Sequence, residues 1–246
     1  MKIEMFNVGW LSSSAAIWRQ GEDAEQRIRM PIPAYLIETD RERILIDTGL
    51  NPAAVADPGG FYGRPDIFAP FALELECSIG EQVDLSTLTR VVLTHLHFDH
   101  AGGLSQLPRS VPIVIQRREW EAGQDAKAVA RNFLHPRDYV LDQQRIVLID
   151  GDHDLLGDGS LELLLTPGHT PGHQSVRVGA DLVLGVDVAH FATTLDDHRF
   201  PMFADDFAAQ ARSAESLRKL RDEGAQVLPG HDPDVLRPGP VASAPG

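Results

Sequence analysis

The sequence has almost no cysteine and comparatively few basic residues. Its single cysteine, Cys77, excludes an intramolecular disulfide and a thiolate-rich zinc site. Any bound metal must therefore be held by histidine and carboxylate side chains. The 22 lysine and arginine residues are outnumbered by 36 aspartate and glutamate residues, which gives a formal net charge of −14. Because such a surface repels phosphate groups, we expect neither nucleic acid nor an anionic membrane surface as a partner.

Long apolar runs are also missing. No window approaches the roughly 18 apolar residues that a membrane-spanning helix needs. Residues 1–6 lack the basic stretch and apolar run that begin a signal peptide. We therefore expect a cytoplasmic protein that does not enter a membrane.

What the sequence does contain is enough apolar material for a globular core. Apolar residues make up 43% of the chain and charged residues 24%, without a low-complexity tract. A chain of 246 residues without an internal linker suits one layered α/β domain. We predict a single domain over residues 1–246, in which residues 238–246, rich in proline, alanine and glycine, form a frayed tail.

Short aliphatic or β-branched runs bounded by turn residues predict strands. Helical spacing of apolar residues predicts a helix at 205–221, and a polar helical stretch is expected at 118–132. Residues 51–79 lack periodicity and predict a long functional loop. Two strand-rich halves with helices between and after them predict an α/β fold with two sheets packed face to face and helices outside. The expected strands are 34–38, 43–49, 90–94, 112–116, 144–150, 161–165, 175–178, 182–186 and 227–229.

Three histidines and an aspartate follow one predicted strand. His95, His97, Asp99 and His100 come directly after the strand at 90–94. Alternate side chains of an extended segment share a face, so His95 and His97 can bind one ion together. Asp99 and His100 fall in the turn that follows, where they can face a second ion. One strand end cannot complete two metal shells, since each ion needs about three protein ligands and an open position.

The missing ligands are available at three other predicted strand ends. His169 follows the strand at 161–165, Asp187 follows the strand at 182–186, and His231 follows the strand at 227–229. A rigid sheet commonly presents functional side chains at its strand ends. These residues complete a candidate set of metal ligands.

The motif His-x-His-x-Asp-His, followed by Gly-His, Asp and Gly-His strand ends, resembles the metallo-β-lactamase superfamily. The resemblance implies an αββα sandwich with two zinc ions at one edge between the sheets; cobalt, manganese or iron could replace zinc. Asp47 resembles the family's aspartate that orients a ligating histidine. By motif matching, His95, His97 and His169 would bind one ion, Asp99, His100 and His231 the other, and Asp187 would bridge them.

Longer stretches resemble the N-acyl-homoserine lactone lactonases. Thr-His-Leu-His-Phe-Asp-His-Ala-Gly-Gly (94–103) and Thr-Pro-Gly-His-Thr-Pro-Gly-His-Gln-Ser (166–175) carry a likeness that spans residues 33–232. It implies a metal-dependent hydrolase that opens a γ-lactone ring by attack of a metal-bound hydroxide and so quenches quorum signalling, with Asp99 as general acid and base. The partner would be a small-molecule lactone, and the chain a monomer or homodimer. An apolar trough for the acyl chain could be lined by Phe98, Phe61, Tyr62, Phe68 and Phe71.

One position departs from this pattern. The best-known branch of these lactonases has a tyrosine three residues after the bridging aspartate, where this chain has His190. An imidazole N–H could donate to substrate in its place, which makes His190 a candidate catalytic residue. The alternative is an ordinary exposed histidine. Among the other histidines, His173 is expected to support the turn after His169, and surface positions are expected for His135, His153 and His198.

Other activities remain compatible with this motif set. The same fold hydrolyses other lactones, esters and phosphotriesters, and fold alone does not select among them. A non-catalytic zinc-binding lactone sensor is a hypothesis of a different class. The complete ligand set favours an enzyme over a sensor.

Overall fold

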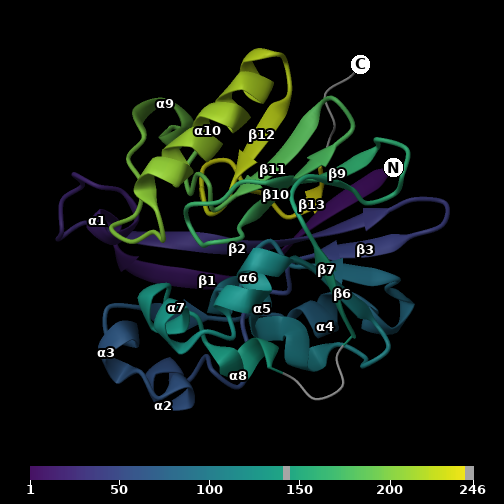
Figure 1. Ribbon diagram of the computed structural model, residues 1–246. Helices are drawn as coiled ribbons and strands as arrows, with labels where there is room; N and C mark the ends of the chain where they lie inside the picture. Colours follow the sequence, from purple (N-terminus) through teal and green to yellow (C-terminus); the bar gives the residue numbers. More distant parts are fainter. Residues whose placement is uncertain (141–144, 242–246) are drawn as a thin grey trace.

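Two β-sheets form the framework of the protein (Figure 1). The computed structural model describes residues 1–140 and 145–241. Gln144, the first residue of one predicted strand, and residues 242–246 of the predicted tail lie outside the described residues. Within the described ranges, no helix has both the length and the apolar character needed to cross a bilayer.

The larger sheet has an antiparallel half and a parallel half. Its strand order is β13-β1-β2-β3-β5-β6-β7, with β4 paired to β1. Strands β3, β5, β6 and β7 run parallel, so their carboxyl ends lie at one edge. The strands are β1 (Lys2–Ser14), β2 (Arg27–Glu38), β3 (Arg43–Ile46), β4 (Ala72–Glu74), β5 (Arg90–Val92), β6 (Pro112–Gln116), β7 (Arg145–Ile149) and β13 (Gly239–Pro240).

The smaller sheet has the order β12-β11-β10-β9-β8. Only its β11–β12 pair is parallel; the other described pairs are antiparallel. The strands are β8 (His153–Asp154), β9 (Leu161–Leu165), β10 (Gln174–Val178), β11 (Leu182–Val186) and β12 (Gln226–Pro229).

The central strands of the larger sheet are buried on both faces. Ile44 and Ile46 share an apolar cluster with Leu163 and Leu184 of the smaller sheet. Leu45, between them, belongs to a separate cluster on the opposite face. Because side chains alternate along a strand, a sheet covered on both sides needs an unbroken apolar run, which residues 44–46 provide.

Helices cover the outer face of each sheet. In Figure 1, α9 (Thr194–Asp197) and α10 (Phe207–Asp222) lie over the smaller sheet, while α2 to α8 lie on the far side of the larger sheet. The layers are therefore helix, sheet, sheet, helix, as predicted. The remaining helices are α1 (Ala15–Trp18), α2 (Pro58–Tyr62), α3 (Pro65–Phe68), α4 (Ile79–Gln82), η1 (Leu85–Thr87), α5 (Phe98–Ala101), η2 (Gly102–Gln106), α6 (Arg117–Ala122), α7 (Ala126–Arg131) and α8 (Pro136–Tyr139).

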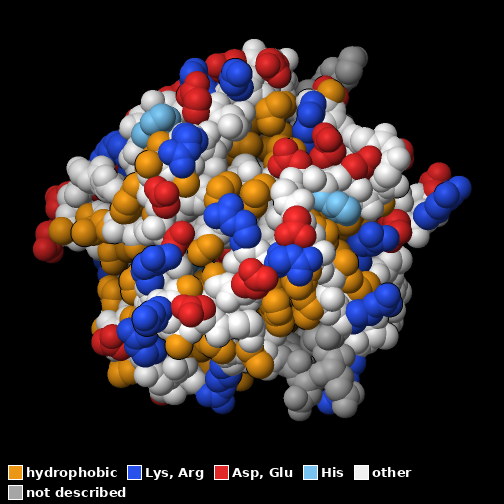
Figure 2. All heavy atoms as spheres, viewed as in Figure 1, with side chains coloured by type: hydrophobic (Ala, Val, Ile, Leu, Met, Phe, Trp, Pro, Cys, Tyr) orange, Lys and Arg blue, Asp and Glu red, His pale blue; other side chains and the backbone are white. Residues whose placement is uncertain are grey.

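Charge is mixed on the surface. Figure 2 shows acidic and basic side chains interspersed over the face in view, with apolar side chains between them. Ion pairs such as Arg117–Asp150 and Arg221–Asp196 join these charges. The net charge of −14 is thus accompanied by many local neutral pairs.

Three sequence expectations are wrong. The stretch at 118–132 is not one helix: α6 ends before Gly123, and Asp125 caps a new helix by accepting from the backbone N–H groups of Lys127 and Ala128. The tail is not frayed at its start, because Gly239 and Pro240 pair with β1. His135 is not at the surface, since only 5% of it is exposed.

Close packing against α10 generates a stability prediction. Gly168 and Gly224 have φ angles of 133° and 111°, which strain any other residue. A Cβ at Gly168 would also collide with the backbone nitrogen of Gln210, whereas a Cβ at Gly224 would meet open space. We expect Gly224→Ala to cost about 1–3 kcal/mol of unfolding free energy. Gly168→Ala should cost about 1–3 kcal/mol more, because it adds overpacking.

Urea unfolding of both variants in the presence of a chelator measures this difference. Equal losses in the two variants would contradict the packing argument.

Candidate metal centre

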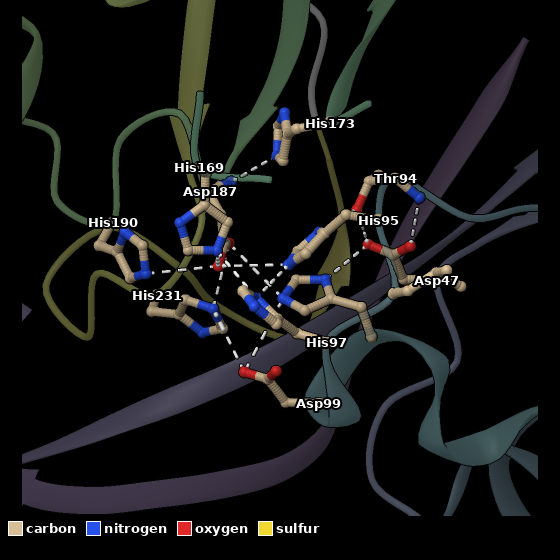
Figure 3. Close-up of polar contacts among 12 residues, drawn as sticks. Asp47, Thr94, His95, His97, Asp99, His169, His173, Asp187, His190 and His231 are labelled. Atoms are coloured by element: carbon tan, nitrogen blue, oxygen red, sulfur yellow. Dashed lines mark hydrogen bonds and ion pairs between the residues drawn. The ribbon is translucent and has the colours of Figure 1, made fainter. Parts of the chain in front are cut away.

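All seven predicted metal ligands meet at one edge of the sandwich. Figure 3 labels each of them except His100. Four of them follow β5 of the larger sheet, and the other three follow β9, β11 and β12 of the smaller sheet. Each is at most 6% exposed. The site is therefore an interior cluster built from both sheets.

Three imidazoles and one carboxylate form a first group. His97 Nδ1 lies 3.0 Å from His95 Nε2 and 2.9 Å from His169 Nε2. Asp187 Oδ2 is 3.3 Å from His169 Nε2 and 3.8 Å from His95 Nε2. Burial, and then the neighbouring imidazoles, hold the pKa values of His95 and His97 well below the usual range. These rings are therefore neutral and can offer lone pairs to a cation.

Two imidazoles and one carboxylate form a second group. Asp99 Oδ2 lies 3.8 Å from His100 Nε2 and 3.7 Å from His231 Nε2. Asp187 Oδ1 lies 3.5 Å and 3.2 Å from the same two nitrogens. Burial is the largest single influence and lowers the pKa values of His100 and His231, but the nearby carboxylates, led by Asp187, together outweigh it, and both pKa values end above the usual value. The field in this group favours positive charge.

Asp187 lies between the two groups. Its Oδ2 faces the first group and its Oδ1 faces the second. Burial would raise its pKa, but His231, His190 and His100 hold the pKa well below its usual range. Val186, the preceding residue, has a φ of 50°, which is strained for a β-branched side chain. The ionised carboxylate of Asp187 can therefore bridge two cations.

Three inward-facing atoms of the cluster lack hydrogen-bond partners. His100 Nε2, His231 Nε2 and Asp187 Oδ1 are buried and have no hydrogen-bond partner. Buried polar atoms are nearly always satisfied, so such orphaned atoms call for an explanation. Neutral imidazole and carboxylate are the ligands expected of zinc and similar ions. The residues therefore fit divalent metal binding.

Asp47 orients two of the histidines. Its Oδ2 accepts from His100 Nδ1 at 2.8 Å and from the Thr94 hydroxyl at 2.7 Å. His95 Nδ1 lies 3.0 Å from that hydroxyl, which leaves the hydroxyl oxygen to accept its proton. Both rings thereby turn their other nitrogen towards the cluster.

Backbone carbonyls orient two further rings. His97 Nε2 donates to the Asn132 carbonyl at 2.8 Å, and His231 Nδ1 donates to the Pro31 carbonyl at 2.9 Å. Sequence reasoning missed both acceptors. No sequence signal marks them, because every residue carries a carbonyl.

His173 supports Asp187 as well as its own turn. Its Nδ1 lies 3.2 Å from the Thr166 carbonyl, and its Nε2 accepts the backbone N–H of Asp187 at 3.2 Å. Burial lowers the pKa of His173 to about 3, so the ring is neutral and can accept. It therefore fixes the backbone of the bridging residue.

His190 is fully buried, so it is not the exposed histidine of the alternative interpretation. Its Nε2 lies 3.3 Å from Asp187 Oδ2, and its ring packs on Trp18 with centroids 5.4 Å apart. Neither ring nitrogen has a hydrogen-bond partner. Burial holds its pKa well below the usual value, which leaves a neutral ring with one N–H to donate.

A cavity of about 270 Å³ opens onto the cluster. Of the aromatic residues predicted for the trough, Phe98 and Phe71 line it, while Phe61, Tyr62 and Phe68 do not. Tyr62 and Phe68 lie behind Phe98, with ring centroids 6.3 Å and 5.1 Å away. Further lining residues that the sequence did not indicate are Ile17, Trp18, Asp66, Ile67, Phe133, His135 and Phe203.

A family model matches most of the chain. The model is described as the metallo-beta-lactamase superfamily, and it matches residues 27–231. One curated relative is the N-acyl homoserine lactonase AttM of Azorhizobium caulinodans, which is 32% identical over 88% of this chain and 86% of its own.

Solved structures agree in fold. An N-acyl homoserine lactone hydrolase with N-hexanoyl-L-homoserine bound at its catalytic metal centre superposes with a TM-score of 0.83 and 25% identity, covering 95% of this chain and 94% of its own. The dizinc quorum-quenching lactonase AidC gives a TM-score of 0.71 and 20% identity, covering 99% of this chain and 92% of its own. At that identity, the likeness to AidC shows the fold alone.

The Asp47 contacts generate a prediction about metal affinity. In Asp47→Asn, an amide replaces the carboxylate whose Oδ2 accepts from His100 Nδ1 and from the Thr94 hydroxyl. The amide NH₂ group cannot accept these hydrogen bonds, so the His100 and His95 rings would lose their fixed orientation. We expect zinc affinity to fall by about 10- to 100-fold. Thr94→Val removes only the link to His95 and should cost less.

Competition with a chromophoric chelator measures this affinity. Asp84→Asn is the control, since this exposed carboxylate only caps the short helix η1. Wild-type affinity in Asp47→Asn would show that Asp47 does not orient the ligands.

Proposed function

The chain belongs to the metallo-beta-lactamase superfamily, and we propose that it is a two-zinc hydrolase that opens the lactone ring of N-acyl homoserine lactones. The observation that carries this proposal is the position of Asp187, between two groups of ligands on the floor of an apolar cavity. The cavity suits a substrate with an apolar chain and a reactive ester. The lactonase relatives support this choice of ester.

Each ligand has a defined role in this proposal. His95, His97 and His169 would hold one zinc ion, Asp99, His100 and His231 would hold the other, and Asp187 would contribute to both. When bound, the zinc pair supplies Lewis acidity and, at neutral pH, a hydroxide nucleophile. Cobalt, manganese or iron could take the place of zinc.

Asp99 moves the proton in this proposal. Its carboxylate lies both among the ligands and in the cavity wall, so it can reach a substrate there. It accepts the proton of the attacking water and returns it to the alkoxide that leaves when the ring C–O bond breaks. Water is thus added across the ester, and the product is an N-acyl homoserine.

His190 is proposed to contact the lactone. Its neutral imidazole carries one N–H, has no hydrogen-bond partner, and lies beside Asp187 Oδ2. That N–H can donate to an oxygen of the lactone and stabilise the charge that develops on it. The Trp18 ring packs against His190 and limits its rotation.

The proposed reaction predicts proton release from acyl homoserine lactones. The wild type should bind about two zinc ions per chain and hydrolyse both a short-chain and a long-chain lactone. Asp99→Asn should lower kcat by about 10²- to 10⁴-fold while zinc stays bound, since the amide cannot transfer the proton. His153→Asn is the control, because His153 is exposed on β8.

A pH-stat assay and elemental analysis of the same samples measure both quantities. Two zinc ions with turnover of an aryl ester or phosphotriester, but not of lactones, would favour another esterase, lactonase or phosphotriesterase. Lactone binding without turnover in wild type and Asp99→Asn would favour the sensor, and absence of metal would contradict the mechanism.

The role of His190 predicts a graded response. His190→Phe should lower kcat/KM by about 10- to 100-fold, because a hydrogen bond to a developing charge contributes about 1.5–3 kcal/mol. His190→Gln keeps an N–H donor and should lose less. Steady-state kinetics on zinc-loaded proteins provide the test, and wild-type kcat/KM in His190→Phe would exclude a hydrogen bond to substrate.

A further inference from the structure

Four of the five ligating imidazoles are oriented through their second ring nitrogen. That nitrogen lies within hydrogen-bond distance of an oxygen in each case. His169 differs, because its Nδ1 is buried and has no hydrogen-bond partner. No hydrogen bond at Nδ1 fixes the direction of this ring, so its position depends on packing against rings such as Phe203 and on the backbone that carries His169. The four oriented rings and their partners are His95 with Thr94, His97 with Asn132, His100 with Asp47, and His231 with Pro31.

The loop that carries His169 is held firmly on one side. Gly168 packs against Gln210 at the start of α10. The backbone N–H groups of Asp205 and Asp206 donate to the carbonyls of His169 and Gly168, at 3.1 Å and 3.0 Å. These contacts tie the loop to α10, but not to the loop that carries His95 and His97.

Gln174 joins the far end of the His169 loop to the Thr94 and Leu93 carbonyls, and Glu119 supplies a second connection between the two loops, closer to the histidines. This residue of α6 is 0% exposed. Its Oε2 accepts the backbone N–H of Gly172 at 2.7 Å, and its Oε1 accepts the backbone N–H of Leu96 at 3.0 Å. Leu96 lies between His95 and His97, and Gly172 comes three residues after His169. One carboxylate therefore spans the two loops whose histidines meet.

The approach of the loops to Glu119 is close. A Cβ at Gly172 would collide with the backbone nitrogen of Glu119, so this position requires glycine. Burial raises the pKa of Glu119 to about 7, while the N–H groups of Gly172 and Leu96 oppose that rise by stabilising the ionised form. A carboxylate is otherwise costly to bury, and two backbone donors are what make this one tolerable.

We propose that Glu119 is a positioning residue that holds His169 against His95 and His97, and so sets the affinity for the ion in that group. The inference rests on the proposed two-ion site. Glu119 touches neither the ion nor the cavity; it acts through the backbone of Leu96 and Gly172. Its effect should therefore be confined to the first group of ligands, because the second group is oriented by Asp47 and by the Pro31 carbonyl.

The test is a metal titration of Glu119→Gln. The amide keeps the size of the side chain but can accept from only one of the two N–H groups with its oxygen, and it turns a donor towards the other. Co²⁺ and Zn²⁺, each added alone to metal-free protein, are titrated in competition with a chelator. We expect one of two affinities to fall by about 10- to 100-fold, while the other changes little.

Reference variants identify which ion is affected. His169→Ala removes a ligand of the first group and His231→Ala a ligand of the second, so the Co²⁺ absorption spectrum of each marks the loss of one site. Glu119→Gln at limiting Co²⁺ should resemble His169→Ala. Asp138→Asn is the matched control. Asp138 is also a buried carboxylate, but it accepts a hydrogen bond from the Asn51 side chain and not from the loops that carry His95, His97 and His169.

A second variant separates positioning from general stability. Glu119→Asp keeps the charge but shortens the side chain, so it cannot span both loops and should show the same selective loss. Thermal unfolding of the metal-free proteins reports stability. Equal weakening of both ions, or loss in proportion to a lower Tm that Asp138→Asn shares, would assign Glu119 a structural role only.

The outcomes also separate this inference from the proposed function. If the wild type binds two ions and Glu119→Gln keeps both affinities, the inference fails and the proposed site stands. If the wild type binds one ion or none, the two-ion proposal fails. If one ion binds, a lower affinity for it in Glu119→Gln but not in Asp138→Asn supports the inference, and an unchanged affinity overturns it. If no ion binds, the inference fails together with the proposed function.

Discussion

Six imidazole rings, that of His190 among them, and two carboxylates lie together in the interior of the sandwich, and the site depends on how their polar atoms are satisfied. Protons alone cannot satisfy them, since burial holds the pKa values of His95 and His97 well below the usual range. The ring protons that can be assigned point outward to fixed acceptors, so the lone pairs converge inside. Each unpaired buried polar group costs about 1–3 kcal/mol. A bound cation removes that cost.

Both sheets contribute ligands, which ties the metal site to the packing of the sandwich. Asp187 comes from the smaller sheet, yet its two oxygens face histidines carried by both. Ions held there would link the sheets, so that binding free energy becomes folding free energy. The contacts of His173, Asp47 and Glu119 involve the backbone and rings around the cluster, and these three residues lie one layer further out.

The cavity above the ligands is assembled differently. Its aromatic walls come from α1, from the loop before β4, from α5, and from loops near residues 133 and 203. None of these segments is itself a strand of the core. Apart from α5, which also carries Asp99 and His100, these wall segments contain none of the predicted ligands, so their side chains can change with little effect on the ligand set. His190 and Trp18 lie where the two parts meet.

Local sequence determined which residue types lie at the site and that they follow strands, although β3 and β5 end at Ile46 and Val92, two to three residues before the predicted ends. The spacing of His95, His97, Asp99 and His100 follows from the alternation of side chains at a strand end, which is a local property. The break in the stretch at 118–132 was also readable, since Asp125 follows Gly123 in the pattern of a new helix cap. The long strand β1 was missed because Asn7, Gly9 and the serines at 12–14 interrupt its apolar residues and weaken the strand signal.

Only the tertiary structure decided how the ligands are held and what surrounds them. The carbonyls of Pro31 and Asn132 accept histidine protons, yet no residue type marks a backbone acceptor. The burial of Glu119 and the neutrality of His190 depend on segments far away along the chain. The sequence gives the chemical type of each side chain directly. Burial and hydrogen-bond partners arise only when distant segments pack together, so they follow from the fold as a whole.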